Sequence, residues 1–134
     1  MTPFELGPRS SVGYICVVRV HHLAFRTADV PRLEQFYTKV LGLAVLRRDE
    51  PRSVWLDAAG TIVMLEQGDA AEPAPDLASK ELVCFAVAPE QHAAVRARLL
   101  SEGVAVEAHT AYTLYFRDPD GRRVGVSSYP DALA

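Results

Sequence analysis

The chain has 134 residues, of which 49% are hydrophobic and 23% charged, and its formal net charge is −3 at pH 7. This length and composition fit one globular domain with its own apolar core. The negative charge gives no attraction for phosphate backbones, and no apolar run approaches the roughly 18 residues that span a bilayer. Residues 1–15 also lack the apolar stretch of a signal peptide. We therefore expect a cytoplasmic protein that binds neither nucleic acid nor membrane.

The first half of the chain predicts one strand, one helix and three further strands. After an irregular extension over residues 1–15, a strand is expected over residues 16–27. Asp29 is a suitable N-cap for a helix whose apolar residues recur at helical spacing, and Gly42 ends that helix. The strands that follow are expected over residues 43–48, 52–57 and 61–67.

The second half predicts the same order of elements. Residues 68–79 are rich in Ala, Pro and acidic residues and have no periodicity, which indicates a linker. A strand over residues 81–88 precedes a helix that Pro89 opens and Gly103 ends. The remaining strands are expected over residues 104–108, 112–117 and 122–128. The fold class is therefore α+β, with two tandem β-α-β-β-β units over about residues 16–67 and 80–129 of a single domain, 16–134.

The two halves also align residue by residue. A shift of about sixty positions places His22–Phe25 on Leu82–Phe85 and Trp55–Gly60 on Phe116–Gly121. Two long copies indicate two fused supersecondary units, because a solenoid needs three or more repeats.

Three motifs in this order resemble the vicinal oxygen chelate superfamily. They are His22–Asp29, then Phe36-Tyr37 with Leu41-Gly42-Leu43, and finally Tyr115–Gly121. The superfamily includes glyoxalase I, bleomycin and fosfomycin resistance proteins, extradiol dioxygenases and methylmalonyl-CoA epimerase. The resemblance implies that the two sheets curl around a cavity and that the protein is a homodimer.

Strand periodicity predicts which side chains face that cavity. Successive side chains of a strand point to opposite faces, so one parity faces the helices and the other the cavity. The predicted cavity residues are Val20, His22, Ala24, Arg26, Ile62, Met64, Glu66, Leu82, Cys84, Ala86, Arg123, Gly125 and Ser127.

Metal-dependent members of the superfamily hold a divalent ion with two His and one or two Glu. His22 matches the first ligand, whereas Leu82, Met64 and Gly125 occupy the other ligand positions. The chain therefore resembles a divergent member that lacks most metal ligands, and we expect no metal cofactor. Glu66 has the correct parity but lies two residues beyond the expected position. The alternative is a rebuilt divalent metal site that uses His22, Glu66 and a third ligand.

Eight residues are candidates for ligand binding, and no catalytic residue is assigned. Each has a structural alternative: the histidine can be a hydrogen-bonded cavity residue, the aromatic rings can serve the core or a dimer seam, and the charged residues can be solvated. The eight candidates are His22, Arg26, Trp55, Met64, Glu66, Leu82, Tyr112 and Arg123.

Two functions from different classes follow. The first is a metal-independent binding protein of the bleomycin-resistance type, which sequesters a planar or amphipathic small molecule in a dimer cavity. The second is a metal-dependent lyase, isomerase or dioxygenase of the glyoxalase type. Missing metal ligands favour the first, and His22 with Glu66 supports the second.

Overall fold

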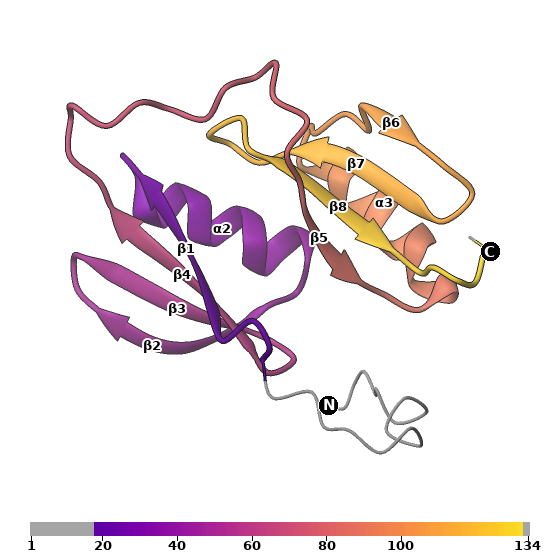
Figure 1. Ribbon diagram of the computed structural model, residues 1–134, viewed down its shortest axis with the longest axis horizontal. Helices are drawn as coiled ribbons and strands as arrows, with labels where there is room; N and C mark the ends of the chain where they lie inside the picture. Colours follow the sequence, from indigo (N-terminus) through magenta and orange to yellow (C-terminus); the bar gives the residue numbers. More distant parts are fainter. Residues whose placement is uncertain (1–17, 133–134) are drawn as a thin grey trace.

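The computed structural model describes residues 18–132, so the expected extension over residues 1–15 lies outside the described residues. The chain forms two four-stranded mixed sheets and two α-helices, which confirms the α+β class and the two tandem units (Figure 1). No strand pairing in the described part of the chain joins the two sheets, and they do not close into a barrel. No helix among residues 18–132 is long and apolar enough to cross a bilayer.

The first unit forms the first sheet, with strand order β1-β4-β3-β2, and helix α2. Strands β1 and β4 are parallel and the other pairs are antiparallel. Its elements are β1 (His22–Thr27), α2 (Val30–Val40), β2 (Ala44–Asp49), β3 (Ser53–Ala58) and β4 (Thr61–Gln67).

The second unit repeats this topology in the second sheet, with strand order β5-β8-β7-β6. Strands β5 and β8 are parallel, as β1 and β4 are. Its elements are β5 (Val83–Ala86), the 3-10 turn η1 (Pro89–Gln91), α3 (His92–Ser101), β6 (Ala108–His109), β7 (Thr113–Arg117) and β8 (Arg123–Ser127).

Local sequence explains where α2 begins and ends. The Asp29 carboxylate accepts a hydrogen bond from the Arg32 backbone N–H at 3.1 Å, and Pro31 lies in the first turn, where its missing N–H costs nothing. Gly42 follows the helix with φ of +72°, a left-handed conformation that glycine adopts without strain. The expected N-cap and helix end are both confirmed.

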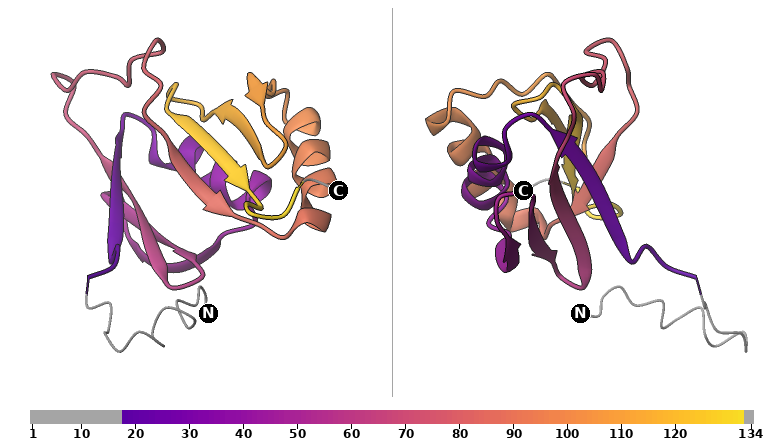
Figure 2. Two further views of the ribbon diagram at one scale, coloured as in Figure 1. Left: turned by 45° about the vertical axis from the view of Figure 1, so that its right-hand side comes forward. Right: turned by 90° about the vertical axis from the view of Figure 1, so that its left-hand side faces the viewer.

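Both helices lie on the same side of the two sheets, as the views of Figures 1 and 2 agree. Side chains of one strand parity point to the helices and are buried: Phe25, Val63 and Leu65 in the first sheet, and Val124 and Val126 in the second. The intervening side chains lie on the opposite side, which we call the open face of each sheet. The open face carries His22, Ala24, Arg26, Trp55, Met64 and Glu66 on the first sheet, and Cys84, Tyr115, Arg123, Gly125 and Ser127 on the second.

The described strands are shorter than expected in three places. The first strand begins at His22, and residues 16 and 17 of the expected strand lie outside the described residues. The strand expected over residues 81–88 covers only Val83–Ala86. In place of a strand over residues 104–108, the two-residue β6 forms at Ala108–His109, because only that segment pairs with β7. Apolar alternation predicts strands but does not supply their pairing partners.

The register also corrects the alignment of the two halves. Trp55 pairs with Met64, and Tyr115 pairs with Gly125, the residue equivalent to Met64. Trp55 therefore corresponds to Tyr115 and not to Phe116. Tyr115 and its partner Gly125 are one position farther apart in sequence than Trp55 and its partner Met64, and this extra residue shifts the match.

A buried polar cluster ties the second unit to the first. The Tyr37 hydroxyl of α2 donates to Asp118 Oδ2 at 2.7 Å, and Arg122 Nη1 donates to the same oxygen at 2.7 Å. Arg122 Nη2 donates to the Arg26 carbonyl at 3.1 Å, and its guanidinium lies 4.5 Å from the centre of the Phe25 ring. The Asp118 side chain is fully buried, so its charge is compensated inside the protein. Burial beside this carboxylate raises the pKa of Tyr37.

Candidate ligand-binding surface

The centre of the first open face is apolar and contains one large aromatic ring. Trp55 of β3 pairs with Met64 of β4, which in turn pairs with Ala24 of β1. The Arg47 guanidinium lies 4.9 Å from the centre of the Trp55 ring, within the range of a cation–π contact. The indole N–H is buried and has no hydrogen-bond acceptor among the described residues. The face thus offers a planar aromatic surface, with an unsatisfied donor beneath it.

His22 lies at the beginning of β1, toward one end of this face. Its Nδ1 lies 3.0 Å from Nδ1 of His21, so one imidazole can donate to the other. The two rings meet edge to face, with 5.2 Å between their centres. Both histidines are exposed.

The second open face repeats the pairing of an aromatic ring with an arginine. The Arg123 guanidinium lies 4.3 Å from the centre of the Tyr115 ring. Glu107 accepts a hydrogen bond from Arg117 at 2.8 Å and another from Arg123 at 2.8 Å. These two arginines lower the pKa of Glu107 to about 2, so the carboxylate is charged at neutral pH.

On the second open face, neighbouring atoms leave little space for a side chain at Gly125. A Cβ at this position would lie 3.1 Å from the Leu114 carbonyl oxygen, 3.2 Å from the Cys84 sulfur and 3.4 Å from Leu82 Cδ1. Leu82 and Cys84 are both exposed and adjoin Gly125 on the same face. The predicted grouping of these three residues is therefore present.

Tyr112 is not on the open face. It precedes β7 with the parity of the buried Leu114, and its ring packs edge-on against Tyr129 with 5.1 Å between the ring centres. The aromatic residue that occupies the open face is Tyr115, which the eight candidates did not include. The sequence signal that could identify it is strand parity counted from Gly125.

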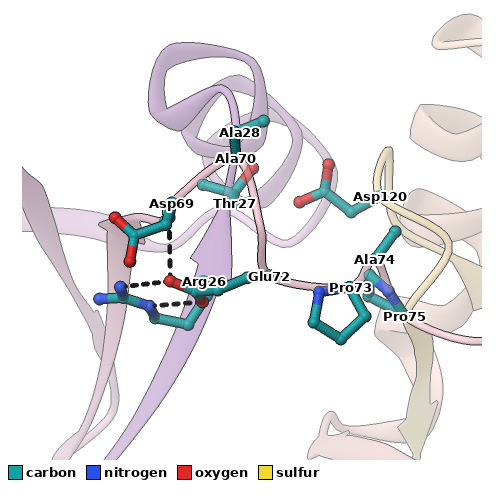
Figure 3. A pocket seen from close by; sticks show the side chains of 11 residues that line it. Arg26, Thr27, Ala28, Asp69, Ala70, Glu72, Pro73, Ala74, Pro75 and Asp120 are labelled. Atoms are coloured by element: carbon teal, nitrogen blue, oxygen red, sulfur yellow. Dashed lines mark hydrogen bonds and ion pairs between the residues drawn. The ribbon is translucent and has the colours of Figure 1, made fainter.

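Arg26 and Glu66 lie at the far end of the first open face, where the linker crosses. Arg26 Nε donates to Glu72 Oε1 at 3.0 Å, and Nη2 donates to Glu72 Oε2 at 2.7 Å (Figure 3). Glu66 lies 3.4 Å from Nη1 of the same guanidinium. Arg26 and a backbone hydrogen bond from Asp69 lower the pKa of Glu72 to about 2. A pocket of about 160 Å³ adjoins this pair. Glu72 was missed because nothing in the linker sequence indicates which strand it contacts.

The donor set does not fit the rebuilt metal site. Strand register places His22 opposite Ile62 and Glu66 opposite Arg26, four residues farther along the strand. Four residues correspond to about 13 Å of strand, too far for two ligands of one ion. Among residues 18–132, no group of three or more His, Cys, Asp or Glu side chains is arranged to hold a metal ion.

Comparisons with solved structures identify the fold. A lactoylglutathione lyase from Agrobacterium tumefaciens is 21% identical and superimposes with a TM-score of 0.65, covering 83% of this chain and 93% of that one. A glyoxalase/dioxygenase from Nostoc punctiforme is 22% identical, with a TM-score of 0.70 and coverage of 84% and 92%. The fosfomycin resistance protein FosX from Listeria monocytogenes is 13% identical, with the same TM-score of 0.70 and coverage of 84% and 92%.

One structure of the Listeria FosX protein contains Mn(II) and dihydroxypropylphosphonic acid. The comparison with curated proteins gave no match. Residues 19–126 match the family model described as Glyoxalase/Bleomycin resistance protein/Dioxygenase superfamily. This match spans most of the chain, in agreement with the duplicated topology and the structural neighbours, and the chain therefore belongs to the glyoxalase/bleomycin resistance protein/dioxygenase superfamily.

Proposed function

We propose that this protein is a metal-independent binding protein that sequesters a planar or amphipathic small molecule. The observation that carries the proposal is the Trp55 side chain on the first open face. Its ring adjoins Met64, and its N–H is buried without an acceptor among the described residues. A buried donor that the protein does not satisfy is rare, and a rotation of the ring on ligand binding would let a ligand oxygen or nitrogen satisfy it.

The pairing of aromatic and guanidinium groups supports a planar ligand with an anionic or electron-rich edge. Arg47 lies over Trp55. Arg123 lies over Tyr115, which is the residue of the second sheet equivalent to Trp55. Arginine can stack on a ring and still direct N–H groups to a carboxylate or phosphate. A ligand between such pairs would have apolar contact area and fixed polar anchors.

The chemistry of the side chains at the family's metal-ligand positions also supports metal independence. Leu82 and Gly125 have no side-chain atom that can coordinate a metal. The thioether of Met64 is a weak ligand for the hard divalent ions. The alternative is a glyoxalase-type enzyme with a rebuilt metal site. It would need ligands from outside residues 18–132, because His22 and Glu66 are separated along the strands.

We propose further that the protein is a cytoplasmic homodimer. Strands β1 and β5 each form one edge of a sheet, and edge strands offer unpaired backbone groups to a second chain. Large apolar side chains are exposed near both edges, including Val20 at 55% and Leu82 at 39%. A second copy could cover them and enclose the open faces. Sedimentation of a species near the chain mass of 14.7 kDa at micromolar concentration would contradict the dimer.

Tryptophan fluorescence tests the binding function directly, because Trp55 is the only tryptophan of the chain. Bleomycin-like glycopeptides, planar aromatic antibiotics and glutathione thiohemiacetals are titrated in turn, with product analysis in parallel. Saturable quenching without turnover supports the proposal. Conversion of a thiohemiacetal would replace it with the enzymatic alternative.

Metal binding is tested by thermal unfolding with Ni or Mn. A ligand that binds only the native state adds about 2.7 kcal/mol of stability at a hundredfold excess over its dissociation constant. A true site would thus raise the melting temperature by several degrees. We expect no such rise, and a rise that His22→Ala abolishes would contradict metal independence.

A further inference from the structure

We propose that the Glu72 carboxylate competes with an anionic group of the ligand for Arg26. When the ligand's anion binds Arg26, it displaces Glu72 and releases the part of the linker that carries it. The inference rests on the proposed binding function and specifies its ligand class: an amphipathic molecule with a carboxylate, sulfonate or phosphate group.

The Glu72 carboxylate is held as a bound anion would be. It accepts hydrogen bonds from Arg26 Nε and Nη2, and its Oε2 also accepts one from the Asp69 backbone N–H at 2.9 Å. Two parallel bonds from one guanidinium are the geometry with which arginine recognises carboxylates and phosphates. Arg26 thus presents a complete anion-binding fork, which a side chain of the protein now occupies.

The backbone near Gly68 is shaped to receive this carboxylate. Gly68 N donates to the Thr27 carbonyl at 2.8 Å, which fixes the start of the linker beside the end of β1. A Cβ on Gly68 would lie 3.3 Å from Glu72 Oε1 and 3.4 Å from Oε2, so the carboxylate packs directly against the glycine. The Glu72 N–H closes a short turn by donating to the Asp69 carbonyl at 3.1 Å.

The ion pair is well formed but readily exchanged. The Arg26 side chain is 48% exposed and the Glu72 side chain 33% exposed, so water and dissolved anions can reach both. Exposed ion pairs contribute little to stability because solvent screens them. A ligand anion that also gains apolar contact on the open face can therefore displace Glu72 from Arg26.

Displacement would free the part of the linker near Glu72, whereas Arg117 Nη2 still donates to the Ser79 carbonyl at 3.1 Å farther along. No helix or strand lies between Gln67 and Val83, and the pocket of about 160 Å³ beside the ion pair is lined by linker residues including Asp69, Ala70 and Pro73 (Figure 3). Loss of the Glu72 contact removes the side-chain tie between β1 and this part of the linker. The ligand's anion would then enter where the carboxylate lies now.

Two dyes with the same aromatic scaffold test the competition. Anilinonaphthalene sulfonate carries an anionic group, and N-phenylnaphthylamine lacks it. In Glu72→Gln, which keeps the side-chain length but loses the charge, we expect sulfonate affinity to rise about three- to fivefold and neutral-dye affinity to stay within twofold. Arg26→Gln should weaken the sulfonate dye selectively, and Glu72→Gln should no longer strengthen its binding in that background.

Glu34→Gln is the matched control for net charge. Glu34 of α2 forms an equally bidentate pair with Arg48 of β2, with two contacts of 2.7 Å. If this control strengthens sulfonate binding as much as Glu72→Gln does, the proposal is overturned. An equal rise in affinity for both dyes in Glu72→Gln would overturn it too. Such a result would mean that the substitution exposes apolar surface and does not free a site for an anion.

Proteinase K cleavage of the linker beside Glu72, located by mass spectrometry, gives a readout that does not need dye binding. Millimolar sulfate, compared with sodium chloride at equal ionic strength, should accelerate cleavage of the wild-type protein. Cleavage of Glu72→Gln should be fast and independent of sulfate. Absence of any sulfate effect on the wild type would overturn the competition, whereas failure of the neutral dye to bind would count against the proposed function alone.

Discussion

The two units share one topology, but helix α2 of the first unit buries more residues than helix α3 of the second. Helix α2 is capped by Asp29 and buries five residues: Val30, Leu33, Phe36, Tyr37 and Val40. Helix α3 has no side-chain cap and buries three residues: His92, Val95 and Leu99. The first of these, His92, has two buried ring nitrogens without a partner among the described residues. The helix of the first unit has a side-chain cap and buries mostly apolar residues, whereas the helix of the second unit has no such cap and buries a histidine.

The second unit obtains part of its core from the first. Phe116 of β7 packs against Phe36 of α2 with 6.1 Å between ring centres, and Phe85 of β5 packs against Tyr37 at 6.4 Å. The Asp118 carboxylate binds the Tyr37 hydroxyl between them. Helix α2 therefore serves both sheets, and duplication of a topology does not divide stability equally between the copies.

The largest expected effect is from Phe116→Ala. The ring is fully buried between the units, so its removal should lower the free energy of unfolding by about 3–5 kcal/mol. Denaturant unfolding followed by both fluorescence and circular dichroism should remain a single transition, because α2 couples the units. Leu100→Ala, at a side chain that is 81% exposed, should change stability by less than about 0.5 kcal/mol. Two separate transitions would show that the second unit folds independently.

Tyr37→Phe should have the next largest effect. It keeps the ring contacts with Phe36 and Phe85 but removes the donor to the buried Asp118 carboxylate. Hydrogen bonds to charged groups contribute about 1.5–3 kcal/mol, and we expect a loss of stability in that range. Equilibrium denaturation measures it. A loss below about 0.5 kcal/mol would mean that Arg122 alone satisfies Asp118.

Asp29→Ala tests the capping difference between the helices. Loss of the side-chain acceptor for the Arg32 N–H should cost about 1 kcal/mol. Asp29→Asn, which keeps an acceptor, should recover most of that stability in the same denaturation measurement. An unchanged midpoint in Asp29→Ala would show that packing of α2 makes the cap redundant.

Substitution of His92 should give the smallest effect on stability, and only at mildly acidic pH. Burial, with the nearby Arg96, lowers the pKa of His92 in the folded protein below its ordinary value of 6.5. The unfolded chain therefore binds the proton more tightly, and stability falls as the pH drops through about 6.5. His92→Leu should reduce this fall when melting temperatures are compared between pH 8 and pH 5. An identical fall in the variant would assign the effect to other groups.

Much of the fold could be predicted from local patterns. The Asp29 cap and the Gly42 helix end are short-range signals, and strand parity distinguished the buried Val63 and Leu65 from the open-face Met64. The prediction of a strand over residues 104–108 was wrong, because a strand needs a neighbouring strand to pair with and periodicity does not identify one. Tyr112, a predicted ligand-binding residue, lies on the opposite face from Tyr115, because the two differ by an odd number of positions and each step along a strand reverses the face.

The sequence by itself determined the order of the elements, the duplication and the helix-facing side of each strand, because these follow from backbone geometry over a few residues. Only the tertiary structure decided which distant groups meet. Tyr37 finds Asp118 across 81 positions of sequence, and Arg26 finds Glu72 across 46. Such contacts depend on how the sheets pack around α2 and where the linker crosses β1, and no local periodicity encodes either.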